Sequence, residues 1–165
     1  VGVLDQFESQ GYRWLNPDRA MGGVLVIDSP TGNGEKVVFE VVNFKQKQIP
    51  RWKDGKIEMV IAVEAVLNFY EQQGTTQLVG LKPRLQLETG AAQQIKREIR
   101  SCIEKAQILN SDILGWGQCV HRSYPDEWKK IAANWYEVYP EVESTIRVKC
   151  RVDRTYLGTE SFSFR

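Results

Sequence analysis

The sequence predicts an α+β fold in which an antiparallel β-sheet of about four strands carries helices packed on one face. Three observations lead to this class. Apolar residues alternate with period two in the first half of the chain, helical periodicity replaces this pattern from Thr89, and a period-two segment returns near the end. The 165 residues, 42% hydrophobic and 26% charged, are typical of a single globular domain covering residues 1–165.

The first half is expected to form one helix and an antiparallel meander. Residues 4–16 predict a short helix that Asp5 caps, with Phe7, Trp14 and Leu15 on its apolar side. Turn-forming residues separate the strands, and Asp54-Gly55 is the tightest of these turns. The strands are expected at residues 22–28, 36–49 and 56–70.

The second half is expected to form two long helices and a returning strand. Single apolar stripes define the helices, and Pro125 opens the second one. The first stripe contains Ile95, Ile99, Cys102, Ile103, Ala106 and Leu109, and the second contains Trp128, Ile131, Ala132, Trp135, Val138 and Tyr139. Residues 141–156 return to period two and predict a half-solvated strand of the same sheet, with Val142, Ile146, Val148, Cys150 and Val152 on its apolar side.

Charge and hydropathy argue against two classes of partner. The net charge is +1 with acids and bases mixed along the chain, so no block of cations indicates a nucleic acid. No apolar run approaches the roughly 18 residues that a membrane span needs. The chain begins at Val1 without a signal peptide, and we expect it to be part of a longer protein.

The three cysteines, Cys102, Cys119 and Cys150, are widely separated and form no CxxC motif. We interpret them as small buried hydrophobes. A disulfide, a reactive thiol, or a zinc site completed by His121 are the alternatives, and the spacing matches no zinc-ligand pattern.

Residues 111–130, "SDILGWGQCVHRSYPDEWKK", look at first like an active site. The nucleophile and base of a catalytic site here would have to be Cys119 and His121, whose side chains point apart on a helix. Asp112 or Asp126 could orient the histidine, but nothing in the pattern requires it. The glycines match no phosphate-binding loop, and no carboxylate pair stands out. We therefore predict no enzymatic activity, no cofactor and no metal.

The aromatic residues of this region have two interpretations. Trp128 and Trp135 are either core anchors, which their register favours, or a stacking platform for a sugar, base or small ligand. Gly115 and Gly117 predict close packing against the sheet or a sharp corner. Trp116 falls on no apolar stripe, and we predict that it is an exposed aromatic at a partner surface.

These residues carry a family resemblance. The pattern of this region consists of an Asp, a Gly-aromatic-Gly, an Arg after a His, a Pro followed by Trp, a second Trp and a later Gly. It resembles the C-terminal region of the Ger(x)C family of spore-germination lipoproteins. They are the C subunits of spore nutrient-germinant receptors, and residues 1–28 resemble the same family. In this chain the pattern is Asp112, Gly115, Trp116, Gly117, Arg122, Pro125, Trp128, Trp135 and Gly158.

The resemblance implies a non-enzymatic receptor subunit that triggers germination with integral-membrane A and B subunits. It implies an N-terminal lipid anchor outside this chain, on the outer face of the spore inner membrane. It supplies no catalytic residue, so the motif residues are expected to serve packing or docking. The alternative is a domain that binds the nutrient germinant directly, which would require a concave apolar pocket with a few polar groups.

Overall fold

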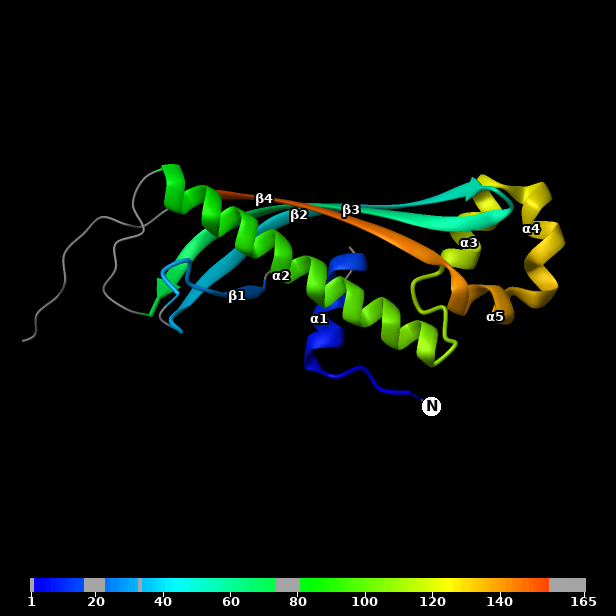
Figure 1. Ribbon diagram of the computed structural model, residues 1–165, viewed down its shortest axis with the longest axis horizontal. Coiled ribbons are helices and arrows are strands. Elements are labelled where there is room, and N and C mark those ends of the chain that lie inside the picture. Colours follow the sequence, from blue (N-terminus) through cyan, green and yellow to red (C-terminus); the bar gives the residue numbers. More distant parts are fainter. Residues whose placement is uncertain (1, 17–22, 33, 74–80, 155–165) are drawn as a thin grey trace, which may run out of the picture. The chain divides into compact units, whose positions relative to one another are not determined.

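The computed structural model describes residues 2–16, 23–32, 34–73 and 81–154 (Figure 1). Among these residues, four strands and five α-helices follow one another in the order α1, β1, β2, β3, α2, α3, α4, α5 and β4. Their bounds are α1 Gln6–Leu15, β1 Val24–Asp28, β2 Lys36–Lys53, β3 Lys56–Gln72, α2 Leu81–Ile108, α3 Trp116–Ser123, α4 Pro125–Ile131, α5 Trp135–Val138 and β4 Glu143–Arg154. Gly158 of the family pattern lies outside the described residues.

The four strands form one sheet in the order β1-β2-β3-β4, which confirms the α+β class and the antiparallel meander. β1 pairs antiparallel with β2, with Val26 opposite Val38. The sheet is mixed, however, because β4 runs in the same direction as its neighbour β3 (Figure 1). The intervening helices carry the chain back to the start of β3, where Thr145 of β4 is hydrogen bonded to Glu58 of β3.

The central hairpin is longer than predicted because β2 continues through Pro50 to Lys53. Proline lacks a backbone N–H and is tolerated where one side of a strand is unpaired. β1 pairs with β2 only between Lys36 and Glu40, so Pro50 lies in a part of β2 that β1 does not cover. The turn is confined to Asp54 and Gly55, whose φ angles are 50° and 76°.

The helices also depart from the predicted bounds. Asp5 caps α1 as expected and forms a reciprocal capping box with Glu8. α2 begins at Leu81, before the predicted Thr89, and Leu87 and Ala91 extend its buried stripe toward the start. The stripe ends at Ala106, because Leu109 lies beyond the helix and is 40% exposed.

The predicted helix after Pro125 is interrupted rather than continuous. It divides into α4 and α5, and two 3₁₀ turns, Ala132–Asn134 and Tyr139–Glu141, follow them. The interruption turns the polypeptide so that Trp128 and Trp135 approach one another at 5.2 Å between ring centroids. Ala132, which the predicted stripe placed inside, is exposed.

The chain divides into two compact units, and β2, β3, α2 and β4 each contribute to both. The first unit contains α1, the β2–β3 turn, α2 from Ile95 onward and α3 to α5. The second contains β1 and the remaining parts of the shared elements. The single domain expected over residues 1–165 stays a prediction.

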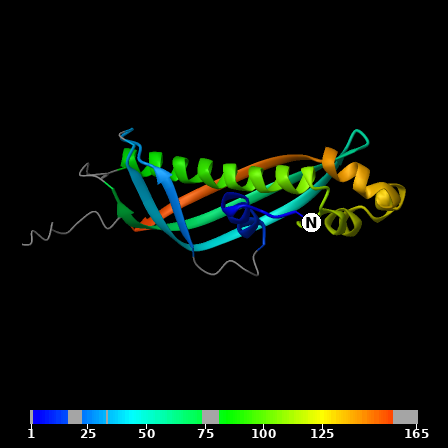
Figure 2. The ribbon, with the colours of Figure 1, turned by 90° about the horizontal axis from the view of Figure 1, so that it is seen from below.

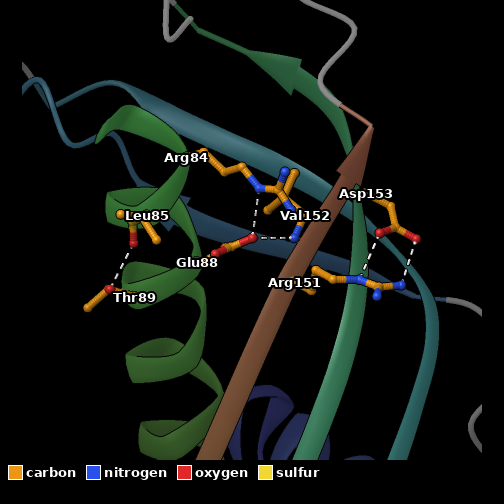
Figure 3. Close-up of polar contacts among 7 residues, drawn as sticks. All are labelled: Arg84, Leu85, Glu88, Thr89, Arg151, Val152 and Asp153. Carbon is orange, nitrogen blue, oxygen red and sulfur yellow. Dashed lines mark hydrogen bonds and ion pairs between the residues drawn. The ribbon is translucent and has the colours of Figure 1, made fainter. Parts of the chain in front are cut away.

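In the second unit, α2 covers one face of the strands (Figure 2). Phe39 of β2 and Phe69 of β3 meet edge to face at 6.1 Å and are buried there. Glu88 of α2 accepts hydrogen bonds from Arg84 Nε at 3.0 Å and from the backbone N–H of Val152 at 2.9 Å (Figure 3). A carboxylate on the helix thereby ties α2 to the last part of β4.

Candidate docking site

The sequence-predicted site residues all lie in the first unit, where α3, α4 and α5 are grouped around the β2–β3 turn (Figure 1). Asp112 organises this group. Its Oδ1 accepts a hydrogen bond from the backbone N–H of Trp116 at 2.8 Å, and its Oδ2 accepts from the N–H of Gly117 at 2.8 Å. Oδ2 also accepts from Trp135 Nε1 at 3.0 Å. One carboxylate therefore satisfies two free N–H groups at the start of α3 and anchors α5.

The two glycines have different tasks. Gly115 precedes α3 with φ of 69°, a left-handed conformation that favours glycine, and it turns the chain from Asp112 into the helix. Gly117 admits the indoles, because a Cβ there would lie 2.9 Å from Trp135 Nε1 and 3.0 Å from Trp128 Cη2. The sharp corner was predicted correctly, whereas the close packing is against two tryptophans rather than the sheet.

Five rings form a continuous series, which we call the aromatic chain: His121, Trp128, Trp135, Tyr139 and Trp116. Successive ring centroids are separated by 5.9, 5.2, 6.0 and 5.8 Å in that order. His121 is exposed, the next two rings are half-buried, and Tyr139 and Trp116 are buried. The series thus runs from the protein surface into the core.

The prediction that Trp116 is exposed is wrong. Its side chain is 0% exposed, and its Nε1 donates to Gln48 Oε1 of β2 at 2.8 Å. Burial of an indole is favourable when its N–H finds an acceptor, as it does here. Trp128 and Trp135 are half-buried rather than deep in the core, so part of each indole reaches the surface.

Cys119 and His121 lie on α3, two residues apart, which is the arrangement that separates their side chains. His121 stacks on Trp128 with 28° between the ring planes. Arg122 is exposed and lies 3.7 Å from Cys119 Sγ through its guanidinium. Asp112 is occupied by the N–H groups of α3 and Trp135, and Asp126 pairs with Lys129 on the surface.

The cysteines differ in burial. Cys102 is buried, as predicted, whereas Cys119 and Cys150 are half-buried, and all three are free thiols. Burial raises the pKa of Cys102 to about 12, and the neighbouring Glu8 adds to this shift. Burial also raises the pKa of Cys150 to about 12, with a further contribution from Glu88. No cluster of metal-binding side chains occurs within residues 2–16, 23–32, 34–73 and 81–154.

A groove of about 780 Å³ lies beside the aromatic chain, between the β2–β3 turn and α4–α5. Its apolar lining comes from Trp52, Ile57, Ile131, Val138 and Val142. Glu58, Glu137, Glu141 and Glu143 are among its polar residues. Lys53, Asp54 and Lys56 also line it, so the groove combines apolar side chains with charged side chains of both signs.

Sequence reasoning missed three residues that complete this region. Gln48 connects β2 to α1 and α3, because its Nε2 donates to Leu15 O at 3.0 Å while its Oε1 accepts from Trp116 Nε1. Tyr139 is buried, and its hydroxyl has no hydrogen-bond partner. Tyr136 is 59% exposed beside the aromatic chain. The alternation of Gln46 and Gln48 with cations in β2 was the one signal that pointed to an inward polar pair.

The described helices include none with the length and hydrophobicity required to cross a membrane. The family model described as "Spore germination B3/ GerAC like, C-terminal" matches residues 1–156.

Two curated proteins of Bacillus subtilis (strain 168) are similar to this chain. Spore germination protein KC is 24% identical over 93% of this chain, and spore germination protein YndF is 22% identical over 96%. The matches cover 41% and 39% of those proteins, so the chain spans about two fifths of their length.

A solved structure has the same fold. The crystal structure of the GerBC protein superposes with a TM-score of 0.79 and 22% identity, over 93% of this chain and 47% of that one.

Proposed function

This chain belongs to the spore germination B3/GerAC-like C-terminal family, and we propose that it acts as a non-enzymatic part of a germinant-receptor C subunit. In this proposal its work is contact with the integral-membrane A and B subunits, through which nutrient detection triggers germination. An N-terminal lipid anchor in the longer protein would hold it at the outer face of the spore inner membrane. No nucleic acid takes part.

One observation supports docking in particular: the aromatic chain ends at the protein surface. Trp128 and Trp135 are half-buried, Trp128 stacks with exposed His121, and Arg122 next to it in the sequence is exposed. Tryptophan, tyrosine and arginine are the residues that most often dominate binding energy at protein interfaces. Asp112 and Gly117 hold the two indoles in place before any partner arrives, which reduces the entropy lost on binding. We therefore place the docking surface on α3, α4 and α5.

The proposal is tested by photo-crosslinking in intact spores from a photoreactive residue at Tyr136. This side chain is 59% exposed next to the aromatic chain, and its hydroxyl donates a hydrogen bond to the adjacent Glu137. We expect capture of an A or B subunit. The matched control is Tyr70, a 71% exposed tyrosine of the second unit. Equal capture from Tyr70, or no capture of a receptor subunit from Tyr136, would reject docking at α3 to α5.

Direct nutrient binding is the second candidate, and the groove beside the β2–β3 turn is the observation in its favour. It combines apolar side chains with polar groups, and a small-molecule site uses both to bury and orient its ligand. Titration calorimetry of this chain with nutrient germinants decides between the two. Heat of binding that disappears in Val138→Asp would favour the nutrient site, whereas absence of binding would leave docking alone.

A further inference from the structure

The strand β2 carries a row of cations on one face of the first unit. Burial alternates along this part of β2, and the even-numbered side chains turn inward. Gln46 and Gln48 each donate through Nε2 to Leu15 O of α1, at 3.3 and 3.0 Å. The odd-numbered side chains therefore project from the opposite face, away from α1. They are Lys45, Lys47, Ile49, Arg51 and Lys53, and all are exposed.

Neighbouring strands add to this row. Lys56 is opposite Lys53 across the two-residue turn, and Arg147 follows Thr145, whose side chain bonds Glu58 on the same face. None of the ion pairs found among the described residues involves these cations. We call the set the basic face: Lys45, Lys47, Arg51, Lys53, Lys56 and Arg147.

Acids lie near the end of the basic face at the β2–β3 turn. Within the first unit, the acids on the same side of β3 and β4 are Glu58 and Glu143, and Glu58 is engaged by Thr145. The whole chain has a net charge of only +1. Lys53 and Lys56 also line the groove that contains Glu137 and Glu141. The cations of the basic face outside the lining of this groove are Lys45, Lys47, Arg51 and Arg147.

We propose that the basic face binds the anionic surface of a lipid bilayer. The residues from Lys45 to Lys53 extend over about 26 Å of strand and project in one direction, so they can reach a planar surface together. Lysines outnumber arginines in the set, which suits a diffuse field of anionic headgroups better than discrete bidentate pairing. Ile49 is 46% exposed at the middle of the row and would enter the headgroup layer.

Vesicle flotation of this chain tests the proposal. We expect binding to vesicles that contain phosphatidylglycerol and none to pure phosphatidylcholine. Binding should disappear at about 1 M salt, where charges are screened beyond about 3 Å. The double variant Lys45→Gln/Lys47→Gln should lower the partition coefficient about 25-fold, because each cation near an anionic surface contributes about fivefold.

The matched control is Lys96→Gln/Arg100→Gln, which removes the same charge from exposed positions of α2 in the same unit. It should change the partition coefficient less than about twofold. Equal losses in the two double variants would overturn the proposal, because net charge alone would explain them. Failure to bind anionic vesicles would also overturn it. If polyglutamate or duplex DNA binds instead with the Lys45/Lys47 dependence, the face serves an acidic protein or a nucleic acid.

The basic face and the docking surface are tested separately. Crosslinking from Tyr136 in spores reports on α3 to α5, and vesicle flotation of the isolated chain reports on β2. Either result can fail while the other holds.

Discussion

Replacing Asp112 with asparagine removes the carboxylate that joins the start of α3 to α5. In the native chain this group accepts from the N–H groups of Trp116 and Gly117 and from the indole of Trp135. Asparagine has nearly the same shape, but it offers one acceptor oxygen, and its NH₂ group is a donor. If that oxygen keeps the hydrogen bond from Trp116, the N–H groups of Gly117 and Trp135 face the NH₂ group of the asparagine, which cannot accept their hydrogen bonds.

The size of the effect follows from these bonds. A hydrogen bond to a charged group contributes about 1.5–3 kcal/mol, and an anion at a helix start contributes about 0.3–1 kcal/mol more. Asp112 is only partly buried, which favours the low end of both ranges. Losing the bonds to Gly117 and Trp135 should therefore lower the free energy of unfolding by about 3 kcal/mol. For a chain of this size, that corresponds to a fall in Tm of about 6–12 °C.

Urea unfolding followed by tryptophan fluorescence measures this difference. The control is Asp126→Asn, because Asp126 is exposed and its ion pair with Lys129 is also exposed. Asp126 is also an acid in the first turn of α4, so we expect the control to change the free energy of unfolding by about 1 kcal/mol or less. If the two variants differ by less than about 1 kcal/mol, Asp112 does not anchor α3 and α5, and our account of the family pattern is wrong.

Two further predictions concern buried groups that titrate. Tyr139→Phe should raise the free energy of unfolding by about 1 kcal/mol, because the hydroxyl is buried without a partner, and an unchanged urea midpoint would contradict this. Stability should also fall as the pH rises from about 9 to about 12. Cys102 and Cys150 keep their protons up to a pKa of about 12 when folded, whereas the ordinary value is 9.0, so the unfolded state ionises first. Urea denaturation at a series of pH values measures how the free energy of unfolding changes with pH. Cys102→Ala should reduce this pH dependence, and a free energy of unfolding that stays constant would refute the burial of these thiols.

The sheet was predictable because its strands bury one face and expose the other. Apolar residues occupy alternate positions of β3 from Ile57 to Leu67. A strand with one buried face is the structure that buries all of them together. The positions at which helices and strands begin and end were harder to predict from the sequence. Pro50 suggests a break, yet the strand continues because no neighbour requires its missing N–H. The parallel direction of β4 depends on where α3 to α5 return the chain, which no local pattern encodes.

Several residues of the candidate docking site stand out in the sequence, whereas their exposure depends on the tertiary structure. Asp112, Gly115 and Gly117 attract attention because an acid and two glycines before a helix indicate a capped, sharp start. Trp116 was assigned to the surface because it matches no local stripe. Its partners are Gln48, 68 positions earlier, and Tyr139 on another segment, so only the tertiary structure explains its burial.

Continuity between surface and core restricts which variants can test docking. Trp135 contacts Trp128, Tyr139 and Asp112, so its replacement would disturb the core at the same time as the surface. Loss of partner binding in such a variant would not distinguish a damaged interface from a damaged fold. Tyr136 and His121 are exposed, and their replacement leaves those contacts in place. Reduced binding at unchanged stability in these two positions is therefore the result that identifies a docking surface, because folding alone cannot produce it.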